Sequence, residues 1–168
     1  MKFNYKNKKK AFSIIEIMAV VFIIAIGMIG MMNLIGQSIR VQRLNEHTLI
    51  AYQLAQEGIE IVRVVRDNNW LAEDSEDFIN VMSPGSYCLD YLDINLNPLS
   101  GACNLYLNSD NFYVRSGENN IETPYSRLIT IENHEGQDHA VNVLVKISWD
   151  DVSGTFEYEA ETKLYDWY

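Results

Sequence analysis

The ionisable residue in the most unusual setting is Glu16, which precedes a long apolar stretch. Residues 17–36 follow it for twenty positions without a charge. A carboxylate at the centre of a bilayer costs at least ~2.5 kcal/mol, so an ionised acid there normally has a partner. The alternative is that Glu16 lies at the membrane interface and is simply hydrated. Its position alone leaves both interpretations open.

The two cysteines, Cys88 and Cys103, are the other residues with a defined covalent chemistry. A disulfide between them would close a loop of about 15 residues and contribute ~3 kcal/mol in the chain-entropy model. Such bonds form in exported domains, which meet oxidising conditions. Two free buried thiols are the alternative, and two cysteines alone are too few for a zinc site. We expect the disulfide.

Other candidate sites match their patterns only in part. Residues 134–139 hold two histidines and two acids, but Gly136 indicates a turn and the spacing differs from helical zinc motifs. Residues 93–104 begin like a calcium loop, yet Pro98 and Asn104 stand where Gly and Glu are needed. No phosphate loop, nucleophile elbow or H-E-x-x-H motif is found. We therefore predict no metal, no cofactor and no enzymatic activity.

The apolar stretch can position Glu16 in a membrane. As a helix, residues 17–36 would span about 30 Å, the thickness of the hydrocarbon core. A secretory signal is shorter, with an apolar part of ~7–15 residues before a cleavage site. Residues 1–11 carry five lysines and no acid, and positive charge stays in the cytoplasm. We predict a single span, with the N-terminus cytoplasmic and the rest exported.

The segment 8–16 (KKKAFSIIE), followed by the apolar run, resembles the class III signal of the type IV pilin superfamily. That superfamily includes pilus subunits and the pseudopilins of type II secretion and competence systems. Its pattern is a basic leader, a small residue, Phe, Ser or Thr, two aliphatic residues and Glu. Ala11 stands where Gly is usual, and the other positions match.

The resemblance implies how the chain is processed and assembled. A prepilin peptidase would cut between Ala11 and Phe12, removing residues 1–11 as a leader and leaving 12–36 as the transmembrane and filament-core helix. Phe12 would become an N-methylated terminus. Its amine could pair with Glu16 of a neighbouring subunit, which would turn two costly charges into one ion pair. The implied partners are other pilin subunits, the peptidase, the pilus assembly machinery and the membrane.

Residues 37–71 are predicted to continue the helix in amphipathic form. Glu60–Arg63 and Arg63–Asp67 have the spacing of helical ion pairs. The segment 53–70 resembles the same region of minor, pilus-modifying pilins. Apolar and small residues repeat at intervals of three and four positions and should form the buried stripe: Leu44, Thr48, Ala51, Ala55, Gly58, Val62 and Val65.

The remainder, 72–168, is predicted to be the exported globular domain. Turn signals in 72–124 indicate loops with short strands. Alternating patterns in 125–168 predict an antiparallel sheet. Its Ser-Trp strand end, Gly-Thr turn and final Asp-Trp-Tyr also resemble minor pilins. An antiparallel sheet packed on the amphipathic helix would be an α+β fold. We expect its strands at 127–132, 140–149 and 155–163.

The charge distribution limits the possible partners. All 23 acidic residues follow residue 11, together with only eight basic ones. An acidic body is a poor ligand for nucleic acid, whose phosphates need Lys and Arg. We expect a structural subunit, a minor pilin, in the bacterial cytoplasmic (inner) membrane and in a cell-surface pilus after assembly. The alternatives are a pseudopilin of a secretion or competence system, and a non-polymerising, membrane-anchored surface binding module or adhesin.

Overall fold

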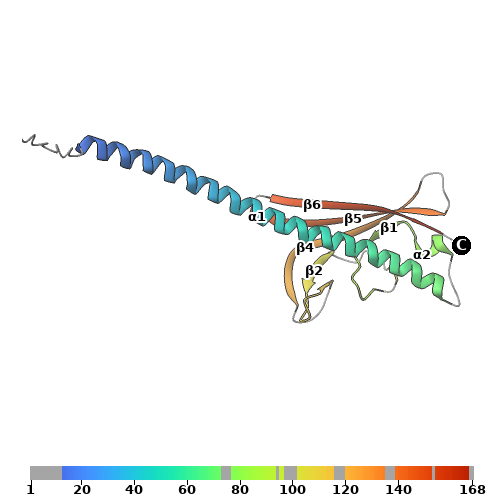
Figure 1. Cartoon of the computed structure of the whole chain (residues 1–168). Coiled ribbons are helices and arrows are strands. Elements are labelled where there is room, and N and C mark those ends of the chain that lie inside the picture. Colours follow the sequence, from blue (N-terminus) through green and yellow to red (C-terminus); the bar gives the residue numbers. More distant parts are fainter. Residues whose placement is uncertain are drawn as a thin grey trace, which may run out of the picture. The chain divides into compact units, whose positions relative to one another are not determined.

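The computed structural model divides the chain into two compact units, Met1–Asn45 and Glu46–Tyr168. The longest element, helix α1 (Ile14–Leu71), contributes to both (Figure 1). The structure describes residues 13–72, 77–93, 95–96, 102–115, 120–134, 139–152 and 154–166.

In the first unit, α1 presents its apolar side chains to the surroundings. The carbonyl of Ser13 accepts hydrogen bonds from the backbone N–H groups of Glu16 (3.0 Å) and Ile17 (3.3 Å), which closes the first turn. Large apolar residues from Ile14 to Ile39 are about half exposed or more. By length and composition, this part of α1 is a candidate membrane span. A helix with such a surface is stable only where another apolar medium covers it.

In the second unit, one face of α1 is buried against a sheet. The predicted stripe is largely correct, because Ala51, Ala55, Gly58, Val62 and Val65 are all buried. Thr48 is exposed, so its assignment to the stripe was wrong. Leu54, Ile59 and Ile61 complete the buried face.

Surface ion pairs on α1 follow the prediction in one case and not in the other. Arg63 Nη1 lies 2.6 Å from Glu60 Oε1, as the i,i+3 spacing indicates. Asp67 does not pair with Arg63. Its Oδ1 instead lies 2.9 Å from Arg66 Nε, and the guanidinium of Arg66 also lies 4.6 Å from the ring centroid of Trp70.

Within the described residues, the sheet has six antiparallel strands, the three long ones predicted and three short ones from the region predicted to hold loops and short strands. The order is β3-β2-β4-β5-β6, with β1 also paired to β4. Three long strands form the centre and one edge, and each extends beyond its predicted bounds. The strands are β1 (Gly85–Tyr87), β2 (Asn104–Leu107), β3 (Tyr113–Val114), β4 (Ile121–Asn133), β5 (Ala140–Asp151) and β6 (Gly154–Tyr165).

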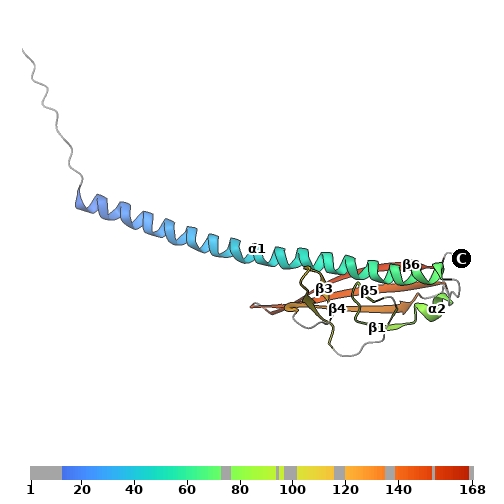
Figure 2. The ribbon, with the colours of Figure 1, turned by 90° about the horizontal axis from the view of Figure 1, so that it is seen from below.

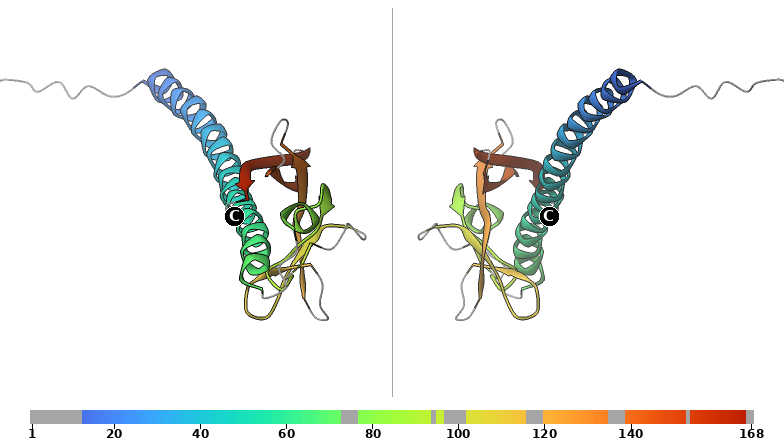
Figure 3. Two further views of the ribbon diagram at one scale, coloured as in Figure 1. Left: turned by 90° about the vertical axis from the view of Figure 1, so that its right-hand side faces the viewer. Right: turned by 90° about the vertical axis from the view of Figure 1, so that its left-hand side faces the viewer.

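The second unit is a two-layer α+β arrangement, as predicted. Its part of α1 lies over one face of the sheet (Figure 2), and the sheet curves beside the helix (Figure 3). Along β5, buried and half-buried residues alternate from Val141 to Trp149, because successive side chains point to opposite faces. A short helix, α2 (Phe78–Val81), precedes β1 and buries Phe78 in the same core.

Candidate functional site

The first turn of α1 carries the acid singled out in the sequence. Glu16 is exposed, as are its neighbours Ile14, Ile15 and Ile17. Among the described residues, no side chain bonds to its carboxylate. The positive end of the helix dipole favours an acid in this turn, but apart from Ser13 the described side chains around it are apolar. Ala11 and Phe12, which were predicted to be the cleavage and methylation positions, lie outside the described residues.

The disulfide between Cys88 and Cys103 is present, with the two Cα atoms 5.2 Å apart. Cys88 directly follows β1 and is buried, and Cys103 directly precedes β2. The bond therefore joins the end of β1 to the start of β2, two short strands that both pair with β4. The alternative of two free thiols is excluded.

A fully buried arginine lies between the disulfide and α1. The guanidinium of Arg127 donates hydrogen bonds to the carbonyls of Leu54 (3.3 Å) and Leu89 (2.9 Å). It forms an ion pair with Glu57, Nη1 to Oε2 at 3.2 Å. Its backbone N–H donates to the carbonyl of Cys103 at 2.9 Å. One residue of β4 is therefore bound to α1 and to both segments that carry the disulfide.

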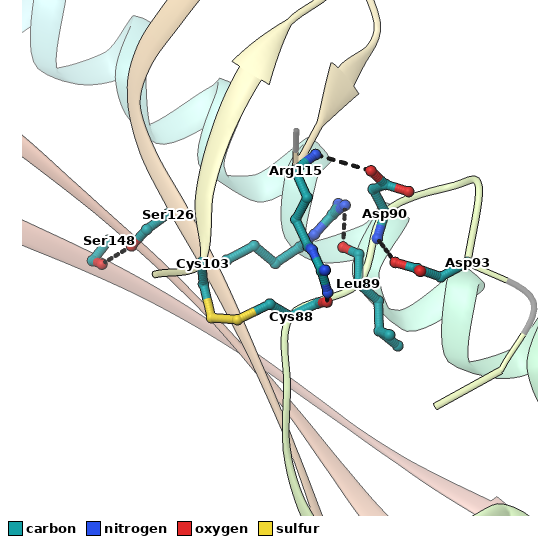
Figure 4. Close-up of a disulfide and its surroundings, with 9 residues drawn as sticks. Cys88, Leu89, Asp90, Asp93, Cys103, Arg115, Ser126 and Ser148 are labelled. Atoms are coloured by element: carbon teal, nitrogen blue, oxygen red, sulfur yellow. Dashed lines mark hydrogen bonds between the residues drawn. A yellow bond between two sulfur atoms is a disulfide. The ribbon is translucent and has the colours of Figure 1, made fainter. Parts of the chain in front are cut away.

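A second network orders the residues after Cys88 (Figure 4). Arg115 donates from its guanidinium to the carbonyl of Cys88 and from its backbone N–H to Asp90 Oδ2 at 2.9 Å. Asp90 Oδ1 accepts from the backbone of Leu92, and Asp93 Oδ2 accepts from the backbone of Asp90. The turn at 90–93 is thus fixed by its own carboxylates.

Burial shifts several ionisation equilibria in this region. Desolvation lowers the pKa of the Arg127 guanidinium, and the charges of Glu57, Asp90 and Asp93 oppose that shift. Burial raises the pKa of Tyr125 to about 12, with smaller contributions from nearby groups. The Tyr125 hydroxyl is 2.7 Å from Nδ1 of His47 on α1. Burial and the charge of Glu57 also raise the pKa of Tyr113.

Sequence reasoning missed Arg127 as a central residue. The available signal was its place in the alternation Tyr125, Arg127, Ile129, Ile131, whose members all face the core. An arginine on the buried face of a strand needs internal acceptors. Those acceptors come from distant segments, so the sequence pattern could identify the burial but not the partners.

Both partial metal motifs lie partly outside the described residues. Within the described residues, no three His, Cys, Asp or Glu side chains lie close enough to hold an ion. The carboxylate of Asp93 is bonded to the backbone of Asp90. His139 Nδ1 lies 3.9 Å from Asp166. Glu135 and Asp138 lie outside the described residues.

Comparison with known proteins identifies the N-terminal segment. A model of the prokaryotic N-terminal methylation motif matches residues 6–32. The match spans four of the five leader lysines, Ala11, Phe12, Glu16 and much of the apolar run, and so covers the segment 8–16 on which the resemblance to type IV pilins rests. No curated protein and no solved structure matches the chain.

Proposed function

We propose that this chain, which carries the type IV pilin signal on a pilin-like helix and antiparallel sheet, is a minor pilin. In this role it is a structural subunit of a type IV pilus or a related filament. It is inserted in the membrane, processed by a prepilin peptidase between Ala11 and Phe12, and assembled through the first half of α1. The motif implies a structural protein rather than an enzyme.

The observation that supports assembly most directly is the surface of α1 around Glu16. Apolar residues surround the helix on all sides from Ile14 to Ile39, and Glu16 is the sole acid of the first turn. Lipid or the helices of other subunits can cover such a surface. An ionised Glu16 in that medium requires a cation. The free amine that cleavage creates at Phe12 of a neighbouring subunit supplies one, and it does so only in an assembly.

The position of the charges supports the proposed orientation. The lysines of residues 1–11 remain cytoplasmic, and the acidic second unit is exported. After assembly this unit would face outward from the filament. The disulfide is consistent with an oxidising compartment on that side of the membrane.

The terminus of the mature protein tests the processing step. We expect N-terminal sequencing and mass spectrometry to find Phe12 as the first residue, with one added methyl group. The same measurement on an Ala11→Gly variant should give the same terminus. A mature protein that retains Met1, or one cut after residue 36, would contradict the proposal.

Replacement of Glu16 tests the assembly step. The Glu16→Gln variant should insert in the membrane and fold normally, yet be nearly absent from filaments sheared from the cell surface. Glu46→Gln removes an exposed carboxylate from the same helix and is the matched control, which should assemble normally. Normal assembly of Glu16→Gln would favour a plain membrane anchor. Retention of the wild-type protein in the membrane, without surface filaments, would favour a pseudopilin.

A further inference from the structure

A cavity of about 460 Å³ lies between α1 and the β2–β3 turn, on the sheet-bearing unit. Its lining combines three aromatic rings with one carboxylate, from Glu57, Tyr91, Asn111, Phe112 and Tyr113. Tyr91 is 46% exposed and Phe112 57% exposed. Neither proposed assembly nor the packing of the core requires large rings at such exposed positions.

The turn that carries Phe112 is held rigidly. Asn108 Oδ1 accepts hydrogen bonds from the backbone N–H groups of Asp110 (3.0 Å) and Phe112 (2.9 Å). The Asn108 N–H donates to the carbonyl of Phe112 at 3.0 Å. Asn111 adopts a left-handed backbone with φ 63°, a conformation that Asn tolerates better than most residues. The ring of Phe112 is therefore displayed by a fixed backbone.

Tyr91 lies in the second ordered turn, between Asp90 and Asp93, whose carboxylates bind backbone N–H groups. The rings of Tyr91 and Phe112 are 5.4 Å apart between centroids and inclined by 49°. Two turns that are about 20 positions apart in the chain thus bring two aromatic rings together at one cavity. Because hydrogen bonds already order both turns, binding of a ligand would cost little conformational entropy of the protein.

The one charged group among the described residues that line this cavity is the carboxylate of Glu57. The side chain of Glu57 is 35% exposed, although its Oε2 lies 3.2 Å from Arg127 Nη1. Asp90 and Asp93 add two carboxylates to the turn that carries Tyr91, where they bind backbone N–H groups. An anionic ligand would be repelled here, whereas a cation would be attracted by both the carboxylates and the ring faces.

We propose that this cavity binds an organic cation, an alkylammonium or guanidinium group, with its charge against the rings of Tyr91 and Phe112 and directed towards Glu57. The same chemistry is offered by a free quaternary amine and by a Lys or Arg side chain of a partner protein. The inference concerns the second unit alone and is independent of filament assembly.

Titration of the full chain in a neutral maltoside detergent tests the site, with ring-labelled Tyr and Phe observed by NMR. Choline is the first probe, and 3,3-dimethylbutan-1-ol, its uncharged isostere, is the control ligand. We expect saturable shifts of the Tyr91 and Phe112 signals with choline and much weaker shifts with the alcohol. The amide of Nα-acetyl-lysine is the third probe. Tighter binding of choline indicates a free amine as the natural ligand, and tighter binding of the lysine derivative indicates a protein side chain.

The Tyr91→Leu variant should weaken binding of the preferred cation about tenfold, because one ring face is lost. Tyr52→Leu is the matched control. Tyr52 is 47% exposed and contacts Tyr158 of β6 rather than lining the cavity, so its replacement should leave binding unchanged. Glu57→Gln should also weaken binding, but it disturbs Arg127 and is secondary. Equal binding of choline and the alcohol, equal affinities of the two Tyr variants, or no saturable shift with either cation would overturn the proposal.

Discussion

At the scale of single residues, Arg127 combines a high desolvation cost with many partners. A buried guanidinium is tolerated when its charge and donors are satisfied inside the protein. The two terminal nitrogens of the guanidinium contact Leu54, Glu57 and Leu89, whereas its Nε has no hydrogen-bond partner among the described residues. The backbone N–H of Arg127 donates to Cys103, so the partners of this residue belong to three separate segments. Arg127 therefore specifies how the segments meet as much as it adds stability.

Replacing Arg127 by Ala should destabilise the fold by about 3–5 kcal/mol, because the buried acceptors lose their donor and Glu57 loses its partner. Thermal or urea unfolding of the full chain in detergent, followed by near-UV circular dichroism, measures the change. Arg63→Ala removes an exposed helical ion pair and should cost less than about 1 kcal/mol. Similar losses in the two variants would show that Arg127 has no special role.

Tyr125 is the second residue whose environment has a measurable consequence. Its pKa is raised to about 12, so the folded state holds the phenolic proton more tightly than the unfolded chain, whose pKa is near 10.0. The stability linked to this proton is complete below pH 10 and is lost as the pH rises towards 12. The loss should reach about 2–3 kcal/mol.

Unfolding measured at several pH values from 9 to 12 tests this linkage, with Tyr125→Phe as the comparison. The variant loses the bond to His47 and should be less stable at neutral pH, but its stability should fall less steeply in the alkaline range. Tyr113 and Lys146 also have raised pKa values and leave a residual slope. Parallel pH profiles for both proteins would contradict the assignment to Tyr125.

At the scale of elements, α1 meets two environments along one continuous helix. Its first part exposes apolar residues all round, and its second part buries a narrow stripe. Gly58 marks the closest approach to the sheet, since a Cβ there would lie 2.8 Å from Val145 Cγ1 and 3.2 Å from Arg127 Cδ. The glycine allows the helix to lie directly over β4 and β5.

Gly58→Ala should therefore destabilise the second unit by about 1–2 kcal/mol, because overpacking outweighs the gain in helix propensity. Gly36→Ala is the control, since a Cβ at Gly36 meets no atom within 4 Å. Its effect on unfolding of the sheet should be negligible. Calorimetry of both variants in the same detergent gives the comparison. If Gly58→Ala is neutral or stabilising, the side chains of the sheet can move to accommodate the added methyl group, which would contradict this prediction.

At the scale of the whole molecule, charge is distributed so that each end of the chain suits one side of a membrane. The charged residues among the first eleven are all lysines, and Glu16 is the one charged residue from 12 to 36. All other acids follow residue 36. In the orientation that we propose, the lysines would resist translocation and the acidic residues would keep the exported body soluble.

Reversing the leader charge tests this distribution. In spheroplasts of a bacterium that expresses the protein, external protease should digest the second unit of most wild-type molecules. In the triple variant Lys8→Glu, Lys9→Glu, Lys10→Glu, the second unit of a large fraction of the molecules should resist the external protease, because the orienting charge is lost. A matching triple Arg variant keeps the charge and should behave as wild type. Equal digestion of the Glu and Arg variants would contradict this prediction, because it would show that the leader charge does not set the orientation.

The sequence by itself determined the features that depend on neighbouring residues. Residues one to four positions apart define each of these patterns: the methylation motif, the apolar span, the helical stripe from Ala51 to Val65 and the alternation along β5. For the same reason the α+β class could be predicted, and the disulfide could be expected because the chain has only two cysteines.

Only the tertiary structure decided which distant segments meet. Strands β1, β2 and β3 have two to four residues each, too few to show a period, and they exist because β4 or β2 offers them hydrogen bonds. The contacts of Arg127 and the aromatic cavity beside Glu57 join residues that are dozens of positions apart. Such contacts depend on the register of the sheet and the position of α1 over it, which no local pattern encodes.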